Sequence, residues 1–119
     1  MAKTNRQYDL EERTYKFAKN IRNFLKKIPK TISNFEDKKQ LIRASGSVGA
    51  NYIEANESLS KKDFRMRIKI CRKEAKESRY WLKLLEIDSD HGLIQERKWL
   101  MDEATELMNI FGAIIRSSK

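Results

Sequence analysis

Residues 61–87 carry a hydrophobic repeat that restricts the possible folds more than any other part of the chain. Apolar and small side chains recur there in alternating steps of four and three: Phe64, Ile68, Cys71, Ala75, Ser78, Leu82 and Leu85. Such spacing lines one face of a helix and is typical of a helix packed in a bundle. Ser60, directly before the segment, is a candidate N-cap.

Three further segments show helical periodicity, at about residues 8–28, 35–57 and 94–117. Asn34 or Ser33 is expected to cap the second of them. With four Gly and one Pro, the chain lacks the turns that an all-β fold needs. Short connections between long helices imply antiparallel neighbours. We therefore predict an all-α fold, an antiparallel up-down-up-down four-helix bundle, with residues 1–119 as a single domain.

The segment at 35–57 contains two glycines in its interior, Gly46 and Gly49. Each costs a helix roughly 1 kcal/mol relative to Ala. A close approach of a second helix is the expected reason for them. The alternative is a break into two shorter helices at Gly46–Gly49.

The chain is basic, with 26 Lys and Arg against 17 Asp and Glu, a net charge of +9. Six cations follow the helical period one residue after the core stripe, and we call them the basic ridge: Arg65, Lys69, Arg72, Lys76, Arg79 and Lys83. Together with Lys19, Arg22 and Lys26 they are the candidate contacts to nucleic-acid phosphates. The alternative is an ordinary solvated helix face.

Charge is distributed unevenly among the helical segments. Residues 1–33 and 61–83 are basic, whereas residues 86–119 hold seven acidic and four basic side chains. In a sequential antiparallel bundle the first and third helices lie diagonally opposite, so their basic faces would meet only across subunits. Basic and acidic helices could also dock on neighbouring copies, which is a route to a closed ring.

Apolar side chains also lie outside the core stripe of residues 61–87. Met66, Ile70, Tyr80 and Trp81 are more than a solvent-facing helix needs, and such a surplus often marks a partner interface. The alternative is a wide core that takes up Ile70 and Trp81.

The sequence offers little catalytic chemistry. A di-metal centre in a helical bundle needs Glu-x-x-His pairs, yet the single histidine, His91, lies in a predicted loop. Cys71 falls on the core stripe, where a buried thiol is expected. Glu54, Glu57, Glu74 and Glu77 are expected to pair with Arg43, Arg67 or Lys73, although Mg²⁺-dependent nuclease chemistry is an alternative. We expect no enzyme activity, metal or cofactor.

Three sequence features predict where the protein is located. A lone cysteine favours a reducing compartment. There is no apolar run of about 18 residues that could cross a membrane, and the first residues show no secretory signal. These features predict a cytoplasmic protein without a membrane partner.

The stretch from Leu41 to Ala55, LIRASGSVGANYIEA, resembles a known family, together with SKKDF at 60–64 and KEAKES at 73–78. It looks like the four-helix-bundle family first noted in ribosomal RNA intervening sequences, whose fold is shared by the accessory variability proteins of diversity-generating retroelements. The resemblance implies a homopentameric barrel with a positive surface. Members of the retroelement branch bind nucleic acid and a reverse transcriptase.

The family motif matches this chain at some positions and departs at others. Gly49 stands where relatives commonly have Pro, and Asn56 where they commonly have Gly. Asn51 and Glu54 match and are carried over as structural or interface positions. The residues expected at an oligomer interface are therefore Asn51, Glu54, Met66, Ile70, Glu74, Glu77, Tyr80 and Trp81.

Taken together, the sequence predicts a non-catalytic, ring-forming protein, a homopentamer by resemblance, that binds RNA or DNA with little sequence preference. It would serve a reverse transcriptase or another RNA-handling partner. The alternative function is an oligomeric protein–protein scaffold without physiological nucleic-acid binding.

Overall fold

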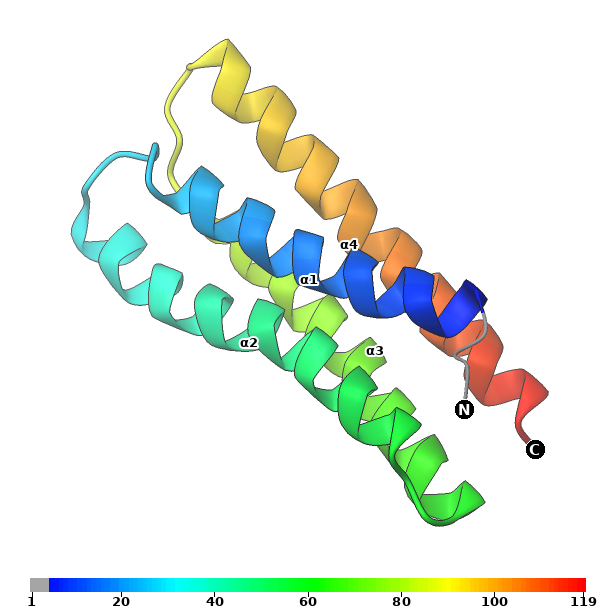
Figure 1. The fold of residues 1–119 in the computed structure, drawn as a ribbon. Coiled ribbons are helices and arrows are strands. Elements are labelled where there is room, and N and C mark those ends of the chain that lie inside the picture. Colours follow the sequence, from blue (N-terminus) through cyan, green and yellow to red (C-terminus); the bar gives the residue numbers. More distant parts are fainter. Residues whose placement is uncertain (1–4) are drawn as a thin grey trace.

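The computed structural model describes residues 5–119, with side chains from Asp9 onward, as four helices joined by short connections. The helices are α1 (Asn5–Leu25), α2 (Ile32–Asn56), α3 (Lys61–Leu84) and α4 (His91–Ser117). Successive helices run antiparallel. The α1–α2 and α3–α4 connections lie at one end of the bundle, and the α2–α3 connection lies at the other (Figure 1). The predicted all-α four-helix bundle is confirmed.

The helices form a closed cycle around one core. Each packs against the next in sequence, and α4 returns to α1, so α1 and α3 lie diagonally opposite, as predicted. The bundle measures 46 × 24 × 22 Å. No helix among the described residues is both long enough and apolar enough to cross a membrane.

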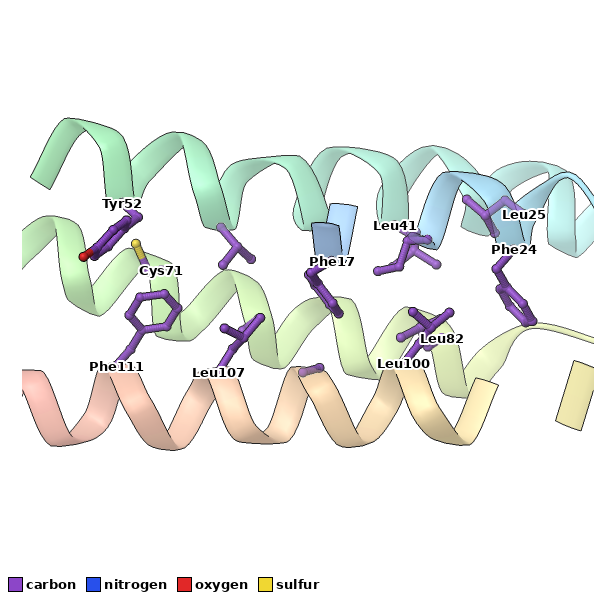
Figure 2. Packing of buried hydrophobic residues seen from close by; sticks show 14 of the residues in the cluster. Phe17, Phe24, Leu25, Leu41, Tyr52, Cys71, Leu82, Leu100, Leu107 and Phe111 are labelled. Carbon is purple, nitrogen blue, oxygen red and sulfur yellow. The ribbon is translucent and has the colours of Figure 1, made fainter. Parts of the chain in front are cut away.

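Side chains from all four helices meet along the bundle axis (Figure 2). Phe17 and Phe24 enter from α1, Tyr52 from α2, and Leu107 and Phe111 from α4. The predicted stripe supplies the α3 side of the core: Ile68, Cys71, Ala75, Ser78 and Leu82 are all fully buried, and Leu85 just beyond α3 is 3 % exposed. The four-and-three repeat of the sequence therefore becomes one seam of the bundle.

Helix α2 runs without a break through both glycines, so the alternative of two shorter helices is wrong. A Cβ added at Gly49 would lie 3.0 Å from Oγ1 of Thr14 and 3.3 Å from its Cβ. Thr14 is buried in α1, and its hydroxyl donates to the carbonyl oxygen of Leu10 at 2.7 Å. The predicted close approach exists at Gly49. At Gly46, a Cβ would meet only the Arg22 guanidinium, at 3.4 Å.

The predicted cap of the second helix is wrong, because the helix begins at Ile32 rather than residue 35. Thr31 is the N-cap, and its hydroxyl accepts from the backbone N–H of Asn34 at 3.1 Å. Asn34 is buried and holds two connections together. Its amide donates to the carbonyl oxygens of Pro29 (2.9 Å) and Glu86 (2.8 Å), and it accepts from the Glu86 N–H at 2.9 Å.

The other helix bounds also differ from the predictions of 8–28, 61–87 and 94–117. Helix α1 ends at Leu25, because Pro29 has no N–H to bond to the Leu25 carbonyl and its ring would clash with that carbonyl. Helix α3 begins at Lys61 with Ser60 as its N-cap, as predicted, but ends at Leu84. Asp90 caps α4 by accepting from the Leu93 N–H at 3.0 Å. His91 is therefore the first residue of α4 and not part of a loop.

Candidate nucleic-acid interface

The basic ridge runs along the side of α3 that faces α4. Five of its six cations are exposed: Lys69, Arg72, Lys76, Arg79 and Lys83. None of the six forms an ion pair within the described part of the chain. These five cations therefore keep their positive charge toward solvent.

Arg65, at the start of the ridge, has a structural role. Its guanidinium donates to the carbonyl oxygen of Ile115 at 2.6 Å and to the hydroxyl of Ser118 at 3.0 Å. These acceptors lie at the C-terminus of α4, where the helix dipole favours a positive charge. Arg65 thus ties α3 to α4 and is the least free of the six.

The α4 surface beside the ridge is uncharged along most of its length. A Cβ at Gly112 would lie 4.0 Å from Cδ of Arg72 and 3.4 Å from the guanidinium of Arg116, so the ridge passes Gly112. The helical period places Met101, Thr105 and Met108 on this same side of α4. Arg116 adds a cation that the sequence analysis missed, because a charge sum over residues 86–119 does not separate the faces of a helix.

Three of the four carboxylates of α4 pair with α1 or the turn that follows it, the fourth, Asp102, pairs with Lys98, and none pairs with the ridge. Glu103 binds the Arg13 guanidinium through two hydrogen bonds of 2.8 Å, and Glu106 lies 3.4 Å from it. Hydrogen bonding to Glu103 raises the pKa of Arg13 above its ordinary value. Glu96 pairs with Lys27 at 2.6 Å. Basic and acidic side chains that could have docked on neighbouring copies thus pair with each other within one chain.

The candidate cations of α1 lie on a different face from the ridge. Lys19 is exposed on α1, diagonally opposite α3, and Lys26 is exposed in the turn directly after α1. Arg22 donates to the carbonyl oxygens of Ala18 (3.1 Å) and Ile42 (3.4 Å) and covers Gly46. One chain therefore does not bring the two sets of candidate residues together.

Several predicted interface residues lie in the seam between α2 and α3. Arg43 pairs with Glu74 at 3.3 Å and with Glu77 at 3.9 Å. The amide oxygen of Asn51 accepts from Arg67 at 3.0 Å, whereas Glu54 is exposed. These contacts show that Asn51, Glu74 and Glu77 already have partners within the chain.

Glu74 is an unusual member of this seam because it is 6 % exposed. One of its carboxylate oxygens, Oε1, is buried without a hydrogen-bond partner. Burial raises the pKa of the Glu74 carboxyl, and the neighbouring Glu77 raises it further, whereas Arg43 lowers it. A buried carboxylate that is only half paired costs stability.

The four apolar candidates on α3 divide into two groups. Ile70 and Trp81 are partly buried, and Trp81 packs against the core, as the wide-core alternative predicts for it. Met66 and Tyr80 are 47 % and 56 % exposed. The Tyr80 ring makes an edge contact with Trp81, with ring centroids 5.2 Å apart.

Exposed apolar side chains on α1 and α2 were missed by the sequence analysis. They include Tyr15, Ile42 and Ile53, and Phe35 near the start of α2 carries Lys39 over its ring at 4.3 Å. The only signal for them is their position off the core stripe. The α1–α2 side of the bundle is thus a second surface with apolar character.

The structure also places Cys71 and His91, the two side chains that the sequence analysis considered for catalytic or metal chemistry. Burial raises the pKa of the Cys71 thiol to about 12, so it stays protonated and is a weak nucleophile. No three His, Cys, Asp or Glu side chains from residue 9 onward are grouped to hold a metal ion. His91 lies at the start of α4, with Nε2 3.3 Å from the amide nitrogen of Gln95.

A family model and a solved structure match the chain. The model of a family described as 23S rRNA-intervening sequence protein matches residues 6–113, which include parts of all four helices. Among solved structures, a protein of unknown function from the S23 ribosomal protein family of Bacteroides thetaiotaomicron is similar, with a TM-score of 0.79. Sequence identity to it is 29 %, over 92 % of this chain and 97 % of that one. The comparison with curated proteins gives no match.

Proposed function

The chain belongs to the family of 23S rRNA-intervening sequence proteins, and we propose that it is a non-catalytic protein that binds nucleic acid along the basic ridge. The observation that carries the proposal is the unpaired state of the ridge. Five exposed cations line one side of α3, while the acidic side chains of α4 pair with cations elsewhere: Glu103 and Glu106 with Arg13, Glu96 with Lys27 and Asp102 with Lys98.

Such a row of cations suits the phosphate backbone better than it suits base edges. Lys and Arg contacts to phosphate give affinity and position the ligand without reading sequence. Each neutralised phosphate releases condensed counterions, so binding of this kind weakens steeply with salt. The expected ligand is therefore RNA or DNA with low sequence preference.

The proposal includes assembly of several copies of the chain, a ring in the form that the resemblance implies. Exposed apolar side chains support it, because Met66 on α3 and Ile42 and Ile53 on α2 lie outside the core. Helix α3 would then meet a neighbour on its outer side and keep the ridge open. A reverse transcriptase or other RNA-handling partner, and the link to retroelement accessory proteins, stay predictions.

A ridge variant tests the nucleic-acid proposal. Replacing Lys69, Lys76 and Lys83 with Gln removes three exposed charges without changing the core. At about 0.7 released counterions per contact, we expect the affinity for single-stranded RNA to fall on the order of 100-fold at about 50 mM salt. Fluorescence anisotropy measures it. The control replaces Lys19, Lys26 and Lys30 with Gln, which removes the same charge from α1 and the connection that follows it, away from the ridge, and should cost little.

The outcomes separate the two candidate functions. Equal losses in both triple variants would contradict the assignment of binding to the ridge. Undetectable binding by the unmodified protein at low salt would reject the nucleic-acid function and favour the protein–protein scaffold. Sedimentation of the same samples gives the subunit number, and a monomer mass would contradict the ring.

A further inference from the structure

The basic ridge is straight. From Arg65 to Lys83 its members are separated by four, three, four, three and four residues, which averages one helical turn, so the row runs parallel to the α3 axis. Eighteen residues at 1.5 Å each give a row about 27 Å long, with one cation per turn of about 5.4 Å. A strand can follow this whole row only if its own backbone is extended. A strand wound in a duplex turns away from a straight row of cations after a few phosphates.

The surfaces beside the ridge also differ from a duplex-binding groove. On the α4 side, the row from Met101 through Thr105 and Met108 to Gly112 is uncharged, so no second line of cations runs parallel to the first. Arg97 donates to the carbonyl oxygen of Leu85 at 2.6 Å, and Lys98 pairs with Asp102 at 2.7 Å. A duplex presents two phosphate strands, and here only one of them would meet cations.

Tyr80 stands immediately beside the ridge on its other side. Its neighbours on the helix surface, four residues before and three after, are the ridge lysines Lys76 and Lys83. The ring is 56 % exposed and is held from below by its edge contact with Trp81, which packs against the core. An exposed, positioned aromatic ring between two phosphate-binding cations is suited to stack with an unpaired base.

We infer that the ridge takes single-stranded nucleic acid, with its phosphates on the row from Lys69 to Lys83 and one base stacked on Tyr80. This inference rests on the proposed function and names the ligand class for the same surface. It assigns Tyr80 to the nucleic acid instead of to a contact between subunits. In a duplex the bases stack on each other and leave no face for the tyrosine ring.

The test compares Tyr80 variants on matched ligands. The probes are one fluorescent RNA single strand, its blunt duplex of equal length, and inorganic polyphosphate as a chain without bases. We expect Tyr80→Ala and Tyr80→Leu to weaken single-strand binding about tenfold, and Tyr80→Phe to leave it within about twofold, since the phenyl ring still stacks. The unmodified protein should bind the duplex more weakly than the single strand. The Tyr80 variants should not change the affinity for the duplex or for polyphosphate.

Tyr15→Ala is the matched control, because Tyr15 is 61 % exposed on α1, across the bundle from α3. It should leave all three affinities unchanged. Duplex binding as tight as single-strand binding, or single-strand binding unaffected by Tyr80→Ala and Tyr80→Leu, would overturn the inference while the proposed function stands. Failure of the unmodified protein to bind any probe at low salt would overturn both.

Discussion

At the scale of single residues, the two glycines of α2 show how the same residue type serves different needs. Gly49 permits α2 to approach Thr14, whose side chain is buried and hydrogen-bonded and so has no room to move. Gly46 faces only the end of the flexible Arg22 side chain. Sequence alone marks both positions as costly in a helix. Only the packing separates the required glycine from the dispensable one.

Alanine substitutions at these positions should therefore have opposite signs. Gly46→Ala is expected to stabilise the protein by up to about 1 kcal/mol, the difference in helix propensity. Gly49→Ala gains the same propensity but forces the α1–α2 contact apart, with a net loss of about 1 kcal/mol or more. Urea denaturation of the two variants measures the free energies of unfolding. Stabilisation by both would show that the contact with Thr14 relaxes at little cost.

At the scale of elements, α3 divides its surface among three tasks. One side contributes the core stripe, the side toward α2 carries the Glu74 network, and the side toward α4 carries the ridge. The regular spacing of residues 61–87 was enough to predict the first and the last. The pairing of Glu74 with Arg43 was among the expected pairings, but its burial depends on how closely α2 and α3 pack.

Glu74 makes the α2–α3 seam sensitive to pH. Because its pKa is raised in the folded protein, the folded state holds the proton above pH 4.5, where the unfolded chain releases it. Unfolding then releases a proton, so this group's contribution to stability falls as pH rises. Glu74→Gln removes the effect while retaining an acceptor for Arg43. We expect the variant to be about 1 kcal/mol more stable than the unmodified protein at pH 7.

Thermal and urea unfolding between about pH 4 and pH 7 checks this prediction, since the advantage of Glu74→Gln should grow with pH. Glu54→Gln, at an exposed carboxylate of α2, is the control and should leave the pH profile unchanged. An advantage that is constant or shrinks with rising pH would mean that the carboxylate is not destabilised in the seam.

The helix ends mark the limit of what local sequence predicts. Thr31, Ser33 and Asn34 are all good N-cap residues, so composition does not choose among them. The structure selects Thr31 because Asn34 is needed elsewhere, in bonds to Pro29 and Glu86. Glu86 is distant in sequence, and no sequence pattern near residue 34 predicts the contact between Asn34 and Glu86. Caps with a single candidate, such as Ser60, were predicted correctly.

At the scale of the whole molecule, the distribution of charge depends on pairing between helices. The sum over residues 86–119 correctly describes an acidic segment. It does not show that Glu96, Glu103 and Glu106 all turn toward α1. This pairing holds α1 against α4 and leaves α3 with an unneutralised side. The ridge was therefore predictable as a row of residues, but its freedom from acidic partners required the bundle.

The salt dependence of binding tests the central claim most directly. An RNA strand of about eight nucleotides, within the usual range for single-strand sites, is titrated at rising NaCl. Five phosphate contacts predict a slope of log K against log salt of about −3.5. In the variant with Gln at Lys69, Lys76 and Lys83, the slope should be smaller in magnitude by about 2. A slope near zero, or an equal slope in that variant, would contradict a phosphate-binding ridge on α3.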